Sequence, residues 1–187
     1  MIRSIQKIDD DIIAKKRRIE EILCNDPDII EVLDNKDLDP SMPEEYLWEN
    51  IFPFLRIPGT QDISKNFITF TLDDDGRTPN NPVNKKQYIQ FVVFVHKNLV
   101  KTEYGIARHD ILGYLIRDIF HLSNKLGAQM KLIFNHEGST DNDYYTRTLR
   151  FELITDNSNK PFKTNAYERK SIVDRHDKVL QPERVGE

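Results

Sequence analysis

The sequence is poor in cysteine and glycine and has no long hydrophobic run, and each shortage argues against a class of protein. One cysteine, Cys24, cannot form a disulfide within the chain, so we predict an intracellular protein with a reduced, half-buried thiol. Only 7 glycines are present, and neither of the glycine-rich motifs that bind nucleotide phosphates occurs. The longest apolar run, 91–95, is far shorter than the roughly 18 residues of a membrane-spanning helix. We therefore expect no nucleotide chemistry and no contact with a membrane.

The chain also lacks a strong excess of charge of one sign. Its 27 basic and 31 acidic residues give a formal net charge of −4 and are scattered along 187 residues. Because such a surface does not attract a phosphate backbone, we expect no specific nucleic-acid binding. The length and the hydrophobic content of 38% suffice for one domain with a core.

A calcium loop is suggested by Asp73, Asp74 and Asp75, which precede Gly76. Aligning this glycine with the invariant glycine of an EF-hand puts Pro82 at the position where the loop needs a bidentate glutamate. The match fails, and a solvated turn is the better interpretation.

The other motifs for catalysis or metal binding also fail on spacing. His109 and His121 share a predicted helix, but they lie about 120° apart around its axis and cannot bind one ion. No G-x-S-x-G motif presents a nucleophile, and Cys24 lies on a helix flank. We therefore predict no catalytic, cofactor-binding or metal-binding residue, and no enzyme.

The N-terminal part is predicted to be helical. Apolar residues recur at helical spacing from Ile5 to Leu23, between charged residues that form a solvated face. The sequence Asn25-Asp26-Pro27 is predicted to end this helix, with Asp26 as the N-cap of a short second helix through Leu33.

Residues 39–58 combine four prolines with eight large apolar or aromatic side chains. Prolines at this density exclude a long helix or an interior strand, so we predict a structured loop with a turn of helix at 44–49. Its apolar groups either pack on the core or form a contact between subunits. Trp48, Phe52 and Phe54 are candidate interface residues for the second alternative.

Two strands are predicted next. Residues 66–72 alternate as a half-buried strand does, whereas 87–97 is apolar on both faces and is typical of a central strand. A long polar loop at 73–86 is predicted to join them into a hairpin. Its charged residues Asp73, Asp74, Asp75 and Arg77 are further candidate interface residues.

The remaining elements complete the predicted fold. A wide apolar stripe predicts a helix over 107–126 that ends at Gly127, and 131–136 and 145–155 are predicted to form a second hairpin. The order helix, two strands, helix, two strands predicts an α+β domain over 1–156, with helices packed on a mainly antiparallel sheet.

A compact polar cluster at 104–110 joins the central strand to the main helix. In one interpretation Arg108 or His109 belongs to a binding site. In the other, which we favour, Asp110 stabilises the first helical turn and Arg108 forms a surface ion pair.

Residues 157–187 form a polar arm with isolated apolar residues, among them Phe162 and Tyr167. Such a segment buries too little surface to offset its chain entropy. It is either disordered or ordered only on a neighbouring molecule, so Phe162 and Tyr167 complete the candidate interface set.

The stretch 86–127, which contains QYIQFVVFVHKNLVKTEYGIARHDILGYLIRDIFHLSNKLG, lies between a long loop and the closing hairpin. In this order of elements, which extends over 5–156, the chain resembles the tail terminators, phage tail-completion proteins of the neck with a small α-β-β-α-β-β subunit. The resemblance implies a ring, usually of six copies, that caps the tail tube and joins it to the head connector.

The implied partners are other copies of the chain, the tail tube, the sheath if the tail is contractile, and the neck proteins. DNA would pass through the ring without being bound specifically, and the protein would be assembled in the host cytoplasm and remain in the virion. The loop at 39–58 and the long arm exceed the minimal subunit. A head-completion or baseplate adaptor is the alternative structural role, and a small hydrolase is the alternative enzyme.

The composition of the arm generates the first prediction. Deleting 157–187 is expected to leave the melting temperature nearly unchanged, because the arm adds little to the core, while weakening assembly. Thermal unfolding and sedimentation of the truncated chain test this, and loss of folding on truncation would refute it.

Overall fold

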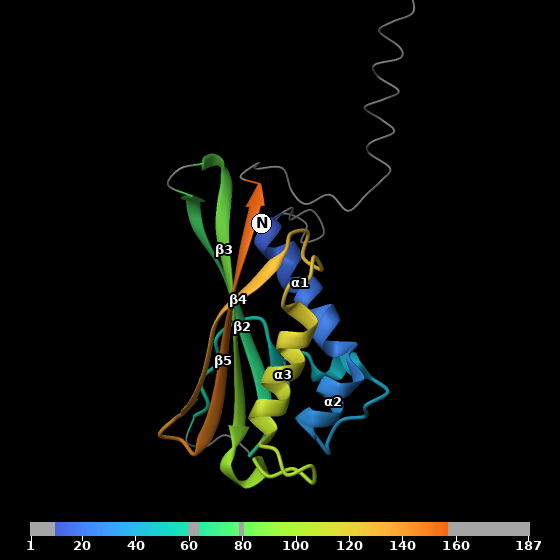
Figure 1. Cartoon of the computed structure of the whole chain (residues 1–187). Coiled ribbons are helices and arrows are strands. Elements are labelled where there is room, and N and C mark those ends of the chain that lie inside the picture. The colour runs from blue at the N-terminus through green and yellow to red at the C-terminus, as the bar shows by residue number, and fades with distance from the viewer. Residues whose placement is uncertain (1–9, 60–63, 79–80, 157–187) are drawn as a thin grey trace, which may run out of the picture.

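Figure 1 shows the computed structural model, which describes residues 10–59, 64–78 and 81–156. Within this part of the chain, a five-stranded sheet carries three α-helices on one face (Figure 1). The predicted α+β class is confirmed. None of the described helices is long and apolar enough to span a membrane.

Two helices begin the described chain. Helix α1 spans Asp11–Cys24, and its N-cap Asp10 accepts a hydrogen bond from the N–H of Ile13 at 3.0 Å. Helix α2 spans Pro27–Leu33, and its N-cap Asp26 accepts from two backbone N–H groups. The predicted corner at 25–27 is therefore confirmed, and each acidic cap satisfies N–H groups that lack a partner within the helix.

The sheet has the order β1-β2-β3-β5-β4. Its strands are β1 (Ile51–Phe52), β2 (Phe67–Thr78), β3 (Asn81–His96), β4 (Met130–Ser139) and β5 (Tyr144–Asp156). The short edge strand β1 pairs parallel with β2, and all other pairs are antiparallel. Helix α3 (Arg108–Phe120) connects β3 to β4 after the 3-10 helix η3 (Lys97–Leu99), and β5 lies between these two strands.

Three predictions of secondary structure were wrong. The predicted loop at 73–86 belongs to β2 and β3, which continue as a hairpin to Thr78 and from Asn81. Polar residues can form part of these strands because their side chains pair across the two strands. The Lys85 ammonium, for example, lies 2.9 Å from the Asp74 carboxylate. Helix α3 ends at Phe120 instead of 126, because the next residues turn and the N–H of Leu122 donates to the Met130 carbonyl.

The third error concerns the proline-rich segment. It contains the 3-10 helix η2 (Pro43–Tyr46) close to the predicted turn of helix, but also the unpredicted strand β1. Strand β1 ends immediately before Pro53 and lies at the sheet edge, where a proline is tolerated.

The main core lies between the helices and the sheet. Phe91 of β3 occupies its centre, with its ring 5.0 Å from that of Phe120 on α3 and 5.8 Å from that of Phe151 on β5. Ile19 and Leu23 of α1 are fully buried in the same cluster, as the apolar stripe predicts. A second, smaller buried cluster comprises Phe52, Phe67, Val92, Phe94 and Tyr144.

Helix α3 is locked to β5 by Arg147. The aliphatic part of Arg147 crosses α3 at Gly113, where an added Cβ would lie 2.8 Å from Arg147 Cγ. The guanidinium then reaches Asp110 Oδ1 at 3.0 Å and Asn135 Oδ1 at 2.7 Å. Gly113 thus allows one arginine to join α3, β4 and β5.

Helix α1 is held to β3 by a buried charge network. The ammonium of Lys15, which is 4% exposed, lies 2.7 Å from Asp11 Oδ2 and 2.5 Å from Gln87 Oε1. Gln87 Nε2 donates to the same carboxylate at 3.0 Å, and the Lys85 ammonium lies 3.5 Å from it. Burial lowers the pKa of Lys15, and the Asp11 carboxylate is the group that compensates its charge.

The second prediction concerns this network. Asp11→Asn removes the carboxylate that Lys15 contacts and leaves the Asp74 carboxylate as the remaining countercharge. We therefore expect a loss of about 2 kcal/mol in the free energy of unfolding at neutral pH, less than the roughly 3 to 5 kcal/mol for a buried pair that loses its only countercharge. Burial alone would raise the pKa of Asp11. Hydrogen bonds from Lys15 and Gln87, together with the charges of Lys15 and Lys85, lower it by more, so the net pKa lies below the ordinary 3.8.

The sign of the pH dependence follows. A folded-state pKa below the unfolded value means that the stabilisation is present above pH 3.8 and is lost as the pH falls through the folded pKa. The wild type and Asp11→Asn should therefore differ less in their free energy of unfolding at acid pH than at neutral pH, as measured by urea unfolding. Asp118→Asn, at an exposed position, is the control; equal losses for both variants would contradict the prediction.

The third prediction concerns Gly113. Alanine is the better helix former by about 1 kcal/mol, but the contact with Arg147 Cγ should cost about 1 to 3 kcal/mol. We expect Gly113→Ala to destabilise the wild-type chain and to stabilise an Arg147→Ala chain, in which the obstructing atoms are missing. Thermal unfolding of the four proteins measures this, and the same sign in both backgrounds would rule the explanation out.

Candidate functional site

The proline-rich segment turns sharply at Trp48. Tyr46 of η2 is buried in the main core, whereas Trp48 has a left-handed backbone with φ of 69° and a side chain that is 58% exposed. The N–H of Trp48 donates to the Ile51 carbonyl at 2.9 Å and closes the turn. Because this backbone conformation is uncommon for a bulky residue, the turn is a specific feature that presents the indole outward.

A chain of buried amides fixes the end of this turn. Asn50 Nδ2 donates to the Asn66 carbonyl at 2.7 Å, and Asn35 Nδ2 donates to Asn50 Oδ1 at 2.6 Å. Asn66 Nδ2 in turn donates to the Leu33 carbonyl at the end of α2. These bonds join α2, β1 and the start of β2, so Trp48 projects from a rigid support.

The next residues cover the small cluster around Phe52. The Arg56 guanidinium lies 4.6 Å from the centre of the Phe52 ring. Lys16 of α1 donates to the Pro53 carbonyl, and Asn142 of the β4–β5 turn donates to the Pro58 carbonyl, both at 2.8 Å. Segment 53–58 is thus tied to α1 at one end and to the β4–β5 turn at the other.

Four large apolar side chains between Trp48 and Ile57 are exposed to solvent. Exposed fractions are 58% for Trp48, 41% for Phe54, 49% for Leu55 and 67% for Ile57, and the Trp48 and Phe54 rings lie 5.5 Å apart. We call these four residues the Trp48 patch. Exposed apolar side chains that lie together, as Trp48 and Phe54 do, make a candidate interaction site.

The structure separates the three candidates predicted in this loop. Trp48 and Phe54 are on the surface, but Phe52 is 2% exposed and belongs to the small cluster. The core alternative is confirmed for Tyr46, Ile51 and Phe52. The Trp48 patch is exposed, and for it the contact between subunits stays a prediction.

The structure describes the side chains of only some of the other candidates. Asp73 is exposed on β2, and Asp74 is paired with Lys85. For Asp75 and Arg77 only the backbone is described, and Phe162 and Tyr167 lie outside the described residues.

Arg108 is used inside the chain. Its guanidinium donates to the carbonyls of Leu99 and Val32 at 2.8 and 2.6 Å and lies 3.0 Å from Asp34 Oδ2. Its side chain is 12% exposed, so the ion pair is more buried than we predicted. Arg108 satisfies a carbonyl in the last turn of α2 and ties this helix to the start of α3.

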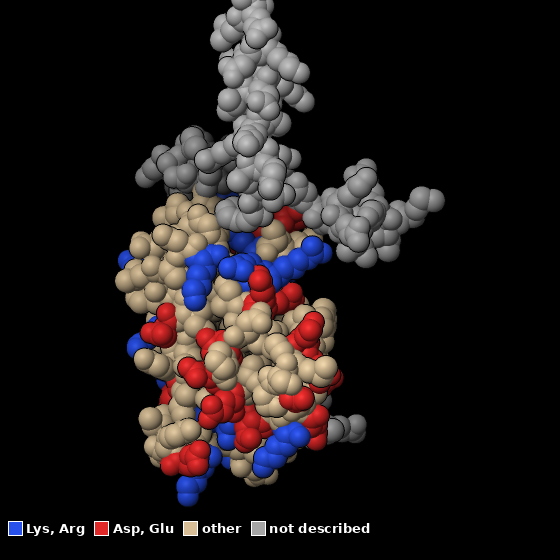
Figure 2. All heavy atoms as spheres, turned by 90° about the vertical axis from the view of Figure 1, so that its right-hand side faces the viewer, with Lys and Arg blue, Asp and Glu red and all other residues tan. Residues whose placement is uncertain are grey.

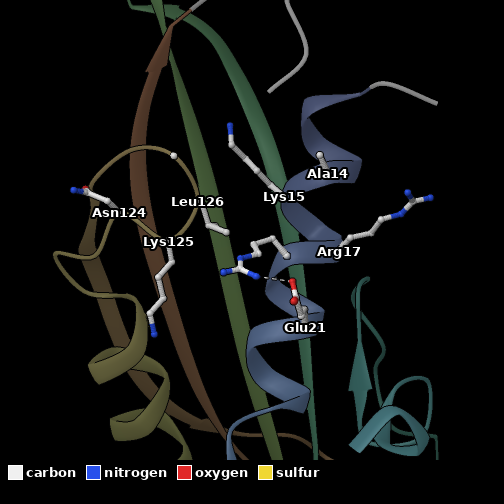
Figure 3. Close-up of a pocket in the computed structure, with 9 residues that line it drawn as sticks. Ala14, Lys15, Arg17, Glu21, Asn124, Lys125 and Leu126 are labelled. Carbon is white, nitrogen blue, oxygen red and sulfur yellow. Dashed lines mark hydrogen bonds and ion pairs between the residues drawn. The ribbon is translucent and has the colours of Figure 1, made fainter. Parts of the chain in front are cut away.

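A basic cleft lies between α1 and the loop that joins α3 to β4 (Figure 3). It has a volume of about 560 Å³, and its charged and amide lining comprises Lys15, Arg17, Arg18, Glu21, Asn124 and Lys125. Arg18 and Glu21 form an ion pair at 2.6 Å. Among the described residues, Arg17 and Lys125 have no ion-pair partner within 4.0 Å. The Arg17 side chain points to the far side of α1 from Lys125 (Figure 3), where it lines a second pocket with Glu44 of the same chain.

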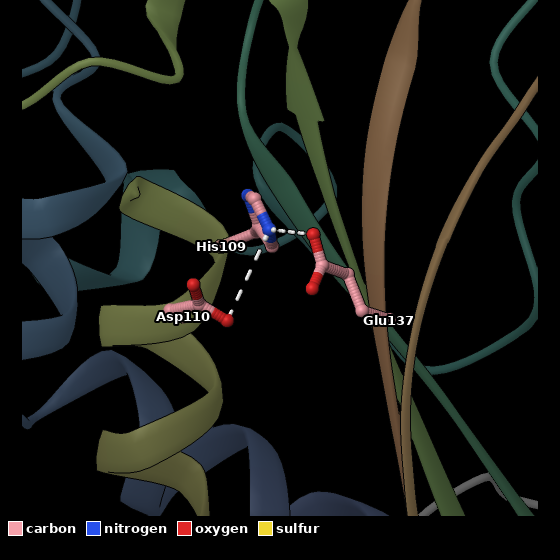
Figure 4. A group of neighbouring side chains, drawn as sticks. All are labelled: His109, Asp110 and Glu137. Atoms are coloured by element: carbon pink, nitrogen blue, oxygen red, sulfur yellow. Dashed lines mark hydrogen bonds and ion pairs between the residues drawn. The ribbon is translucent and has the colours of Figure 1, made fainter. Parts of the chain in front are cut away.

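A histidine and two carboxylates meet between the first turn of α3 and β4 (Figure 4). His109 is 3% exposed, and its Nε2 lies 3.2 Å from Glu137 Oε1 and 3.9 Å from Asp110 Oδ1. Its ring stacks on Tyr145, with 5.9 Å between the centres. The three residue types are possible metal ligands, and a histidine beside a carboxylate could act as a base.

Arg147 brings a positive charge to this cluster. Its guanidinium lies 3.0 Å from Asp110 and 4.0 Å from Glu137 and so supplies the positive charge that a metal ion would otherwise bring. Among the described residues, no serine, threonine or cysteine side chain bonds to His109 as a nucleophile would. Burial together with the nearby Glu20 charge raises the pKa of Cys24 to about 11, which keeps this thiol protonated at neutral pH.

Two features of the surface escaped the sequence analysis. The basic run 15–18 indicated a solvated helix face, and nothing local showed that Lys125 would lie across a cleft from it. The acidic residues are also less scattered than predicted, because 26–49 contains nine acidic residues and one lysine. A charge count in windows would have found this second feature.

Comparisons with known proteins supply one family. None of the curated proteins compared with this chain matches it. The sequence profile of the YomW family matches residues 26–153, which is more than half of the chain and includes α2, α3 and all strands except the end of β5. The chain therefore belongs to the YomW family, whose name associates it with phages and prophages.

Proposed function

We propose that the chain is a structural virion protein of the phage neck. In this proposal it forms a ring that caps the tail tube and joins the tube to the head connector, as a tail terminator does. The observation that carries the proposal is the Trp48 patch, a set of exposed apolar side chains on a rigid turn. The phage association of the YomW family and the resemblance of the element order to tail terminators support it.

The patch has the properties of an assembly surface. Tryptophan and phenylalanine contribute the most binding energy in protein interfaces when a partner removes them from water. A patch on one side of a subunit that meets a different surface of the next copy generates a closed ring when the rotation fits. The expected copy number of six comes from the resemblance to tail terminators.

A structural protein at another position in the virion would use the same patch. A head-completion or baseplate adaptor differs from a tail terminator only in which virion proteins it contacts. A hydrolase is less well supported, because the one histidine–carboxylate cluster among the described residues is occupied by Arg147. The proposal requires no cofactor and no turnover.

The fourth prediction tests assembly. At high concentration the protein should sediment as a ring, and negative-stain images should show a central channel. Trp48→Glu should weaken assembly by at least about tenfold, because a charge replaces the apolar centre of the contact. Tyr114→Glu is the matched control, since Tyr114 is 54% exposed on α3 and belongs to neither the patch nor the cleft.

Two results would contradict this proposal. The first is a protein that stays monomeric at every concentration and also in the virion. The second is assembly that Trp48→Glu leaves unchanged while Tyr114→Glu weakens it.

A further inference from the structure

Strand β4 forms one edge of the sheet, and its first residues are covered on the outer side (Figure 1). The Met130 carbonyl accepts a hydrogen bond from the N–H of Leu122 at 2.7 Å, and the N–H of Met130 donates to the Ser123 carbonyl at 3.0 Å. The N–H of Leu132 donates to His121 Nδ1 at 3.2 Å. The turn that follows α3 therefore protects this edge as far as Leu132.

The rest of β4, residues 133–139, has an unprotected outer side, and we call it the open edge. In the described part of the chain, no strand pairs with this side and no loop backbone bonds to it. Unpaired N–H and C=O groups of an edge strand form a template for a further strand, which proteins often block with lysine or proline. The open edge contains neither residue.

The open edge also exposes apolar side chains. Ile133 is 45% and Phe134 48% exposed, and the Phe134 ring lies 5.7 Å from the ring of His136. Glu137 is the one carboxylate of the open edge. On the side of the molecule with α1 and α2, by contrast, charged side chains are frequent, as on a solvated surface (Figure 2). An extended segment that pairs with the open edge gains backbone hydrogen bonds and covers apolar groups in the same contact.

Strands that are already part of the sheet fit the open edge poorly. A second open edge, paired antiparallel over its full length, would centre on His136 and place the two Glu137 carboxylates at diagonal positions, where like charges repel. The opposite edge of the sheet is occupied at Ile68 and Thr69 by β1, which Pro53 follows directly. A segment outside the sheet avoids both obstacles.

The chain has such a segment in its arm, 157–187, which lies outside the described residues. The arm begins directly after β5, the neighbour of β4 in the sheet. Extended at roughly 3.3 Å per residue it spans about 100 Å, several times the width of five strands, and so reaches a neighbouring copy. It contains the adjacent β-branched residues Ile172 and Val173, which favour a strand, between the basic residues Lys170 and Arg175.

We propose that residues 170–175 of one copy pair with the open edge of a neighbouring copy and extend its sheet by one strand. This inference rests on the proposed self-assembly and gives the arm a site in addition to the Trp48 patch. Backbone hydrogen bonds hold the arm, the exposed Ile133 and Phe134 select its apolar residues, and Glu137 suits its basic ones. Because arm and edge are different surfaces, the contact passes from each copy to the next, as a closed ring requires.

Hydrogen exchange tests the pairing at the backbone. On assembly of the wild type, outward-facing amides of 133–139 should exchange at least about tenfold more slowly, because they gain hydrogen bonds. Ile172→Pro should abolish this protection and weaken association, measured by sedimentation, by about tenfold or more, because proline lacks an N–H and does not fit inside a strand. Thr164→Pro, in the same arm but outside 170–175, is the matched control and should change neither quantity.

Disulfide cross-linking tests whether the contact joins two copies. In a Cys24→Ala background, one chain carries His136→Cys on the open edge and a second carries Val173→Cys in the arm. Oxidation of the mixture should give a dimer that contains one chain of each kind. Tyr114→Cys, at an exposed position on α3, replaces the edge cysteine in the control and should give no such dimer above background.

The outcomes distinguish this inference from the proposed function. Wild-type rings whose amides at 133–139 exchange as fast as in the monomer would overturn the strand pairing and leave the proposed function standing. A wild type that never self-associates would overturn both. A cross-link that forms only when both cysteines are on the same chain would show that the arm covers its own edge, and would overturn the contact between copies.

Discussion

The structure depends on keeping both faces of strand β3 out of water. Ile89, Phe91, Val93 and Val95 face the helices, whereas Val92 and Phe94 belong to the small cluster around Phe52. A strand that is apolar on both sides contributes stability only when each side is covered, since each large side chain gains about 1.5 to 3 kcal/mol on burial. The three helices cover one face of the sheet. The other buried cluster has the 53–58 segment beside it, so the position of this segment follows from the composition of β3.

Proline explains why an extended segment can serve as this cover. A chain that crosses a sheet face outside the ladder must satisfy its own backbone groups, and Pro53 and Pro58 have no N–H to satisfy. Their carbonyls accept hydrogen bonds from Lys16 and Asn142, which belong to different elements. The prolines that excluded an interior strand in the sequence analysis thus fit a cover that is anchored at its two ends. Strand β1 adds a short third anchor at the sheet edge.

Most helices and strands could be predicted from patterns in short stretches of sequence. The features that were not predicted depend on contacts between residues far apart in the sequence. The apolar stripe of α1, the Asp26 cap and the two-sided composition of β3 are properties of short windows, and all three are confirmed. Residues 73–86 were predicted as a loop because they are polar, which a short window of sequence shows. Their pairing across the β2–β3 hairpin is a contact between residues apart in the sequence, which such a window does not show. The same limit applies to the candidate site. Trp48 and Phe54 were identifiable from composition, but the burial of Phe52 depends on Phe67 and Arg56, and the cleft joins Arg17 to a loop more than a hundred residues later.

Two properties that disfavour an isolated subunit occur together in 26–58. The outward side of the covering segment is apolar instead of polar, and the residues before it concentrate like charges that repel one another. The fold requires only part of this composition. The burial of Phe52 constrains only the inward side of the covering segment, and among the acidic residues Asp26 caps α2 while Asp34 and Glu49 form ion pairs. Folding of the monomer therefore leaves the outward composition of this region unexplained. A partner that covered the proposed assembly surface would supply a physical reason for the apolar part, because Trp48 and Phe54 would gain burial in the contact.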